Sequence, residues 1–437
     1  MAGELNRLID TLARDAARAM APGVPTRDGD MTTRVRALTD EPHFVAEMVQ
    51  RHADYAAAVE SVASDADLSR IAPRGELGPR LIAVSGEPRL SAEDLVPALI
   101  GSAAAEVRCR GLNPDPDSVS GLALRNLDRS RRIGRRDPTE ITTFLGFTRL
   151  TLRTGQSLAL PWGVLTPLVG YYGVAEWLPA SQPHSCVMAA EHTLSIAIVE
   201  PKPPSDQSAT GRLFLRPPER VPKAITDHHE WVQFTTRLLS LAVILGTPNL
   251  RVAPVATFQY TLLPYELPGG AYSSLVLLAP KGDGVVDSNE CREIERWGRI
   301  LKANYGTQLD VAARRVIAAL SQRIDPADRL IDAVIALESL FGADQDATLR
   351  VAGSLAWLLA PDDPAGRETL RAELTRIYAL RSRVVHGRDE DPLDVSAAAD
   401  RAVEVAAAAL AVLLERRHDL VPIDSTERSK RLLLALP

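Results

Sequence analysis

The residues best suited to acid–base chemistry lie together near the C-terminal end of the chain. The segment RSRVVHG, residues 381–387, holds Arg381, Ser382, Arg383 and His386. Imidazole gains or loses a proton near neutral pH, and guanidinium binds anionic oxygens through paired hydrogen bonds. These side-chain types suit a site that transfers protons beside a negatively charged group.

Apolar spacing places this segment at the end of an amphipathic helix, residues 364–386. One apolar stripe recurs every three or four residues and must pack on neighbouring helices: Leu370, Leu374, Ile377, Leu380 and Val384. At about 100° per residue, Arg381 lies at the edge of that stripe, whereas Ser382, Arg383 and His386 point away from it. We therefore expect His386 on an outward face and not in the core.

The glycine directly after the histidine predicts where the helix ends. Gly387 is a natural C-cap, so His386 is expected at the terminus, and the ideal divergence of about 140° between Arg381 and His386 need not hold there. The partial negative charge of a helix C-terminus favours imidazolium, which suits a proton donor. The neighbouring arginines oppose that effect, so the protonation state is left open.

A second helix, residues 326–341, carries a carboxylate inside its apolar stripe. In helical projection Glu338 falls between Val334 and Ile331. An unpaired buried charge costs several kcal/mol or more, so Glu338 needs a partner, and Arg381 is the obvious candidate. Such a pair would either fix only the register of two helices or orient Arg381 for catalysis, and both interpretations stay open.

Length and composition indicate a globular protein of about two or three domains. Hydrophobic residues make up 46% and charged residues 24% of the 437 positions, which excludes a disordered chain. The net charge of -6 argues against nonspecific binding of nucleic acid over the whole surface, so any nucleic-acid site must be a local basic patch.

The three cysteines lack a CxxC pair, which favours a reducing, cytoplasmic setting. The N-terminus lacks a signal-peptide pattern, and no apolar run is long enough to span a membrane, so we expect no membrane partner.

Sequence texture divides the chain into three regions and predicts a multidomain α+β protein. Residues 1–138 read as helix-rich or mixed, and residues 139–285 as a β-rich α+β domain with one helix at 226–245. Runs with β-branched and aromatic residues predict its strands, at 141–154, 192–200, 211–217, 255–263 and 273–280. Residues 286–437 predict an all-α bundle with a C-terminal tail. Its expected helices run at about 288–303, 308–322, 326–341, 346–360, 364–386 and 394–416.

Two further clusters were weighed as binding sites. Six arginines crowd into residues 125–136 and could follow a phosphate backbone: Arg125, Arg129, Arg131, Arg132, Arg135 and Arg136. A solvated loop between domains is the favoured interpretation, because no aromatic residues are interleaved for base stacking.

A metal site could combine His184 and Cys186 with His192 or the pair His228 and His229. The spacing matches no zinc pattern, so histidines in loops or on the surface are the favoured interpretation. No metal or cofactor is expected, and glycine-rich phosphate loops are absent from the sequence.

The C-terminal motifs resemble the HEPN superfamily, most closely the Apea-like HEPN domains of bacterial anti-phage systems. The resemblance covers residues 300–417 and rests on IDAVIALESLFG, LRVAGSLAWLLA and RIYALRSRVVHG. The superfamily motif is an arginine, four to six residues of which the first is usually polar, and a histidine; Arg381, Ser382 and His386 fit the four-residue version.

The resemblance implies a metal-independent endoribonuclease of a defence or toxin system. RNA supplies its own nucleophile, the 2′-hydroxyl, so the protein needs only proton transfer and charge stabilisation. His386 would act as general base or acid and Arg381 would stabilise the phosphate, with Ser382 and Arg383 in support. HEPN nucleases usually dimerise, so a homodimer or higher homo-oligomer is expected, and the N-terminal region would restrain the nuclease until a phage-derived or cellular trigger arrives. The alternative is an inactive HEPN sensor or scaffold that binds nucleotides, RNA or proteins.

Overall fold

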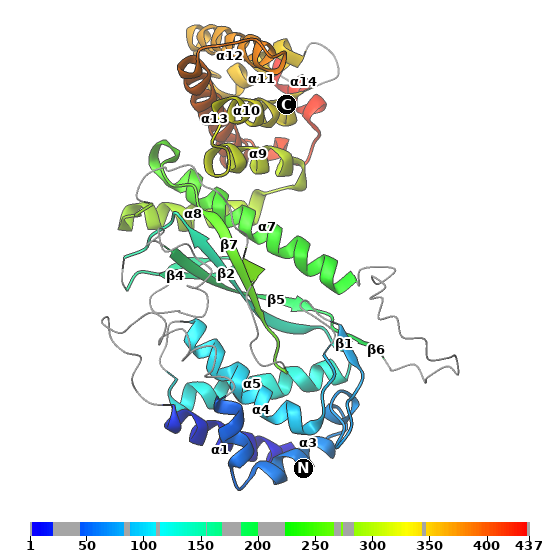
Figure 1. Cartoon of the computed structure of the whole chain (residues 1–437). Helices are drawn as coiled ribbons and strands as arrows, with labels where there is room; N and C mark the ends of the chain where they lie inside the picture. Colours follow the sequence, from blue (N-terminus) through cyan, green and yellow to red (C-terminus); the bar gives the residue numbers. More distant parts are fainter. Residues whose placement is uncertain are drawn as a thin grey trace.

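The computed structural model describes residues 2–20, 44–82, 88–110, 114–153, 155–167, 185–199, 223–265, 272–273, 284–342 and 347–434. Figure 1 shows these residues as an α+β molecule, with N-terminal helices on one face of an antiparallel sheet, two helices on the other face and a helical bundle beyond them. Among the described residues, every helix falls short of the length and apolar character that a membrane span requires.

Helices dominate the N-terminal layer. They are α1 (Ala2–Ala19), α3 (Tyr55–Ala63), α4 (Ala92–Cys109) and α5 (Pro116–Gly134), with a further helical stretch at 44–51. Leu12 of α1, Leu99 of α4 and Leu127 of α5 belong to one buried cluster, which also takes in Ile141 and Leu194 from the sheet. Burial of this shared apolar surface holds the helices against the sheet.

The sheet has the strand order β3-β4-β5-β2-β7-β8, and its pairs are antiparallel. The bounds are β2 (Thr139–Thr148), β3 (Leu158–Leu160), β4 (Gly163–Pro167), β5 (Ser185–Leu194), β7 (Val255–Leu262) and β8 (Tyr272–Ser273). Strand β1 (Arg80–Ile82) pairs separately with β6 (Ala197–Val199). The apolar runs ITTFLGFT and VATFQYTL are strands as expected, whereas β3 and β4 were not predicted, and the expected strand at 211–217 lies outside the described residues.

Two helices cover the other face of the sheet. They are α7 (Lys223–Gly246), which matches the predicted helix, and α8 (Ser288–Asn304). A capping box between Asp287 and Glu290 starts α8. The two helices meet where α7 ends, because a Cβ on Gly246 would lie 2.8 Å from the backbone nitrogen of Ile294. Only glycine allows this close approach.

The C-terminal bundle confirms most of the expected helices within a few residues. Its helices are α9 (Asp310–Ser321), α10 (Pro326–Phe341), α11 (Ala347–Leu359), α12 (Pro364–Val385), α13 (Pro392–Glu415) and α14 (Ser425–Leu433). Helices α10, α12 and α13 each begin with an Asp–Pro pair, in which the aspartate caps the first turn. One continuous apolar core joins the bundle to α7, α8 and the near face of the sheet.

The C-terminal segment contains α14, although only a tail was expected there. A buried arginine of this helix joins it to the bundle by hydrogen bonds. Arg428 is fully buried and donates to the carbonyl oxygens of Leu340 (2.7 Å), Leu420 (2.9 Å) and Ile423 (2.8 Å). Burial lowers the pKa of its guanidinium to about 10. Because Leu340 lies in the last turn of α10, Arg428 satisfies a carbonyl that the helix leaves without a partner.

Candidate functional site at the end of α12

Helix α12 ends at the residues that the sequence singled out. The amide of Gly387 donates to the carbonyl of Val384 at 3.0 Å, and the amide of Arg388 donates to the carbonyl of Arg383 at 3.1 Å. Gly387 has a φ of 71°. These bonds form a Schellman motif, in which the left-handed residue is usually glycine. The predicted C-cap is confirmed, and His386 lies exposed at the terminus as expected.

Arg381 lies half-buried one turn before the histidine. Its Nε atom is buried without a hydrogen-bond partner among the described residues, and so is the hydroxyl of Tyr378. Burial raises the pKa of Tyr378, the Glu338 carboxylate raises it further, and the Arg381 guanidinium lowers it. Glu338, Tyr378 and Arg381 are therefore close enough to influence one another. Sequence reasoning missed Tyr378, although its position three residues before Arg381 places it on the same helix face.

The expected ion pair between Glu338 and Arg381 was a wrong prediction. Among the described residues, no salt bridge or hydrogen bond joins the two side chains. Glu338 is only half-buried, so water solvates its carboxylate and the energetic need for a partner is smaller than the helical projection implied. Arg381 therefore keeps its Nε donor without a protein acceptor.

Arg383 is engaged within the chain and does not present a free cation. Its guanidinium donates to both carboxylate oxygens of Glu390, at 2.6 and 3.2 Å. The pKa of Glu390 is lowered, first by this hydrogen bond. The acidic segment RDED that follows Gly387 supplies this partner, a signal that the sequence carried and that was overlooked. Ser382 is exposed, and its carbonyl accepts the amide of His386 at 3.1 Å.

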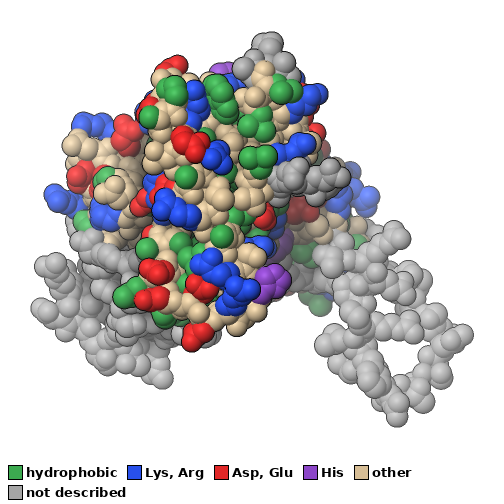
Figure 2. Space-filling view, turned by 90° about the horizontal axis from the view of Figure 1, so that it is seen from above, with side chains coloured by type: hydrophobic (Ala, Val, Ile, Leu, Met, Phe, Trp, Pro, Cys, Tyr) green, Lys and Arg blue, Asp and Glu red, His purple; other side chains and the backbone are tan. Residues whose placement is uncertain are grey.

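A groove of about 620 Å³ runs beside Arg383 between α12 and α13. Its charged lining mixes three arginines with three carboxylates: Arg376, Arg383, Arg401, Glu373, Glu390 and Asp394. Arg401 bridges to Glu373 across the groove at 3.0 Å. Figure 2, viewed from the bundle end, shows Lys/Arg and Asp/Glu side chains interspersed over this face of the molecule. The groove therefore carries no net charge from these six residues.

The arginine run at 125–136 is mostly built into the N-terminal layer. The expected loop is wrong, because these residues form the C-terminal half of α5 and its cap. Arg129 is buried 3.6 Å from Glu106, Arg131 binds Asp65 at 2.9 Å, and Arg135 bridges Asp67 and Asp137. Arg132 donates to the carbonyl of Pro138 at 2.6 Å. Only Arg125 and Arg136 are exposed without such a partner among the described residues, so the run is not a continuous RNA-binding surface.

The histidines considered for a metal site form a buried pair. His192 and His228 lie 2.9 Å apart between Nε2 and Nδ1, and His192 stacks on Trp231 with ring centroids 3.9 Å apart. Burial lowers the pKa of each ring to about 4. The thiol of Cys186 instead donates to the carbonyl of Leu150, and burial raises its pKa to about 12. His184 lies outside the described residues, and the described ones contain no metal-binding group of three ligands.

The α12 terminus thus combines an exposed imidazole at a helix C-terminus with a half-buried guanidinium whose Nε donor is free. The first can exchange protons with a bound molecule, and the second can donate to an anionic oxygen. Comparison of the chain with protein-family models, with curated proteins and with solved structures finds no match in any of the three.

Proposed function

We propose that this protein is a metal-independent endoribonuclease of the HEPN type, with its reaction centre at the C-terminal end of α12. The observation that carries the proposal is the position of exposed His386 five residues after the half-buried Arg381, which makes no salt bridge among the described residues. The exposed part of this guanidinium can donate to a phosphate oxygen of bound RNA. The HEPN-like spacing of the motif is the second support.

RNA cleavage at this site needs no group beyond the chain and its substrate. The 2′-hydroxyl attacks the adjacent phosphate, His386 accepts its proton or protonates the leaving 5′-oxygen, and Arg381 stabilises the charge that develops on the phosphoryl oxygens. Exposed Ser382 orients the phosphate or the imidazole. The products are a 2′,3′-cyclic phosphate and a 5′-hydroxyl.

Arg383 has a different role in this proposal from the one first expected. Its bidentate pair with Glu390 occupies the guanidinium that was to grip the RNA backbone. The pair ties the last turn of α12 to the segment that follows Gly387, so Arg383 positions the terminus that carries His386. We therefore treat Arg383 as a positioning residue.

A homodimer completes the proposed site. One imidazole can serve as base or acid in a given step, and a second copy supplies the other role. Two large apolar side chains are exposed near His386 in sequence, Val385 directly before it at 49% and Leu393 at the start of α13 at 78%. Apolar side chains beside a catalytic terminus suit contact with a second copy of the chain.

The biological assignment rests on the HEPN resemblance alone. A cytoplasmic nuclease that cuts cellular RNA needs restraint, and the proposal gives that task to the N-terminal helices and the sheet, released by a phage-derived or cellular trigger. The shared core between the sheet and the bundle offers a physical connection for such control.

Cleavage of labelled RNA by the purified full-length protein in EDTA tests the proposal. We expect cleavage by wild type and a loss of about 10²-fold or more in the His386→Ala variant, since general acid–base catalysis contributes about 10²–10⁴-fold. His418→Ala is the matched control, because His418 is also an exposed histidine of the bundle. Undiminished cleavage by the His386→Ala variant would refute the site.

An inactive sensor is the second candidate function, and the Arg383–Glu390 pair favours it by removing one cation from the motif. In that case wild type binds the labelled RNA without cutting it under every condition that includes the trigger. Binding without cleavage, equal in wild type and the His386→Ala variant, would select this alternative.

A further inference from the structure

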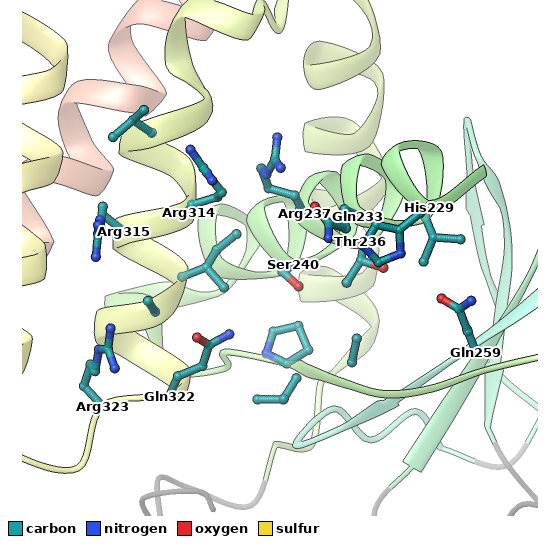
Figure 3. Close-up of a pocket in the computed structure, with 17 residues that line it drawn as sticks. His229, Gln233, Thr236, Arg237, Ser240, Gln259, Arg314, Arg315, Gln322 and Arg323 are labelled. Carbon is teal, nitrogen blue, oxygen red and sulfur yellow. Dashed lines mark hydrogen bonds between the residues drawn. The ribbon is translucent and has the colours of Figure 1, made fainter. Parts of the chain in front are cut away.

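An open pocket of about 620 Å³ lies where the sheet layer meets the bundle. Helix α7 and strand β7 line one side and α9 lines the other (Figure 3). Four arginines converge there, one from α7 and three from α9 and the residues that follow it: Arg237, Arg314, Arg315 and Arg323. In the part of the chain that the structure describes, no carboxylate lines the pocket, which distinguishes it from the mixed groove between α12 and α13.

Aspartates that are not part of the pocket lining pair with three of these arginines. Asp310 holds Arg237 at 2.7 Å, and the nearly buried Asp332 holds both Arg315 (2.5 Å) and Arg323 (2.7 Å). Arg314 is exposed, and the contact it makes is to the backbone carbonyl of Asp310 at 3.4 Å. Asp328 also lies close enough to Arg323 to raise its pKa, so four arginines face three carboxylates and these groups leave a net charge of +1 around the pocket.

The ion pairs fix the guanidiniums before any ligand arrives. Asp332 has a side chain only 3% exposed and binds one arginine with each of its two oxygens, so Arg315 and Arg323 are held side by side. Each guanidinium has five N–H donors, and a single carboxylate contact leaves most of them available. A preorganised pair of guanidiniums is suited to phosphate, which accepts paired hydrogen bonds from each.

The rest of the pocket suits the uncharged part of a ligand. Val232, Pro254 and Ile317 contribute buried or nearly buried apolar surface. Gln233 and Gln259 bring amide groups to the end of the pocket opposite Arg315 and Arg323 (Figure 3). A volume of 620 Å³ is typical of small-molecule sites.

We propose that this junction pocket binds a phosphate-bearing small molecule of mononucleotide size, with its phosphates against Arg314, Arg315 and Arg323 and its uncharged ring toward Gln233 and Gln259. This site is separate from the α12 terminus and does not rest on the proposed nuclease activity. Because the ligand contacts both the sheet layer and α9, its binding stabilises the folded junction and raises the melting temperature of the whole chain.

Calorimetric titration of the full-length protein in EDTA tests the inference with ATP, pyrophosphate and adenosine as probes. We expect ATP to bind at least tenfold more tightly than pyrophosphate, adenosine to show no measurable binding, and ATP to raise the melting temperature. Arg314→Gln should weaken ATP binding about tenfold, since it removes a charged donor without breaking a salt bridge. Arg371→Gln is the charge-matched control, because Arg371 lies on α12 outside the pocket lining and the partly exposed pair that it breaks with Glu368 contributes little.

Three results would overturn the proposal. The first is an ATP affinity that is the same in the Arg314→Gln variant and in the wild type. The second is adenosine that binds as tightly as ATP. The third is a protein that binds neither ATP nor pyrophosphate but binds an RNA oligonucleotide through Arg314. Binding of ATP should persist in the His386→Ala variant, so the outcome is independent of the nuclease assay.

Discussion

Arginines crowd together on α5 and again at the end of α12, and the two groups differ in their partners. On α5, Arg129 and Arg131 are turned into the fold beside Glu106 and Asp65. At the end of α12, Arg383 has an acidic partner, but the Nε of Arg381 has none. The denser cluster in the sequence is thus the structural one. The comparison teaches that the position of carboxylates, more than the density of cations, decides which arginines are available to a ligand.

The largest expected effect is loss of stability when the buried α5 arginine is removed. Arg129→Ala removes one of the two arginines beside the nearly fully buried Glu106, which keeps Arg110 and the hydroxyl of Thr142 as partners; breaking a buried pair costs about 3–5 kcal/mol. Urea unfolding monitored by circular dichroism measures the change. Arg136→Ala, on the exposed end of the same run, should alter the free energy of unfolding by less than about 0.5 kcal/mol. Equal losses in the two variants would contradict the division between buried and exposed arginines.

Arg381→Ala should show the opposite behaviour, with a large loss of activity and a small change in stability. Removing one charge-stabilising donor costs about 10²–10³-fold in rate. The half-buried guanidinium makes no salt bridge among the described residues, so the free energy of unfolding should change by about 1 kcal/mol or less. Initial rates of RNA cleavage and urea unfolding on the same preparation separate the effects, with Arg371→Ala as the control on α12. A variant that loses stability and activity together would place Arg381 with the structural arginines.

The buried histidine pair predicts that stability falls in mild acid. His192 and His228 have pKa values lowered to about 4, whereas an unfolded histidine titrates near 6.5. The unfolded chain therefore binds more protons between these values, and stability is lost as the pH falls through this window. A shift of this size on one ring corresponds to about 3 kcal/mol. Urea unfolding at several pH values from 7 to 4 measures how the free energy of unfolding depends on pH. The His228→Asn variant should show a weaker pH dependence, and the His418→Asn control should not. An unchanged pH dependence in the His228→Asn variant would show that other groups cause it.

The smallest expected effect is at the exposed ion pair that ends α12. Arg383→Gln and Glu390→Gln should each change the free energy of unfolding only slightly, because solvent screens an ion pair at the surface. A positioning role predicts a severalfold loss of RNA cleavage in both variants. A loss confined to Arg383→Gln would indicate direct contact with RNA and restore the role first expected for this residue.

Local signals in the sequence predicted the bundle well. The Asp–Pro pairs before α10, α12 and α13 and the glycine after His386 act within a few residues, so the helix bounds follow from them. Runs of β-branched and aromatic residues are local signals too, and they predicted most of the strands in which they occur. Strands β3 and β4 are short, and the short helix α14 has Leu432 and Leu433 as its only apolar residues, so these three elements offer little apolar pattern to detect.

Contacts between distant segments could not be predicted in the same way. Helical projection placed Glu338 correctly near Arg381, since both side chains shift the pKa of Tyr378. It could not show whether water reaches the Glu338 carboxylate. The pairing of the α5 arginines with Asp65 and Asp67 depends on how α5 packs on an earlier segment. Arg314, Arg315 and Arg323 of the junction pocket are close in sequence, and only the fold brings Arg237 of α7 to them.

The most direct test of the central claim is cleavage of an RNA that carries a single 2′-deoxynucleotide at the mapped cleavage site. In EDTA, wild type should cut the all-ribose RNA to a 2′,3′-cyclic phosphate and a 5′-hydroxyl and leave the substituted position intact, and the His386→Ala variant should cut neither. Cleavage at the deoxy position, or 3′-hydroxyl and 5′-phosphate ends, would contradict attack by the 2′-hydroxyl and with it the role assigned to the end of α12.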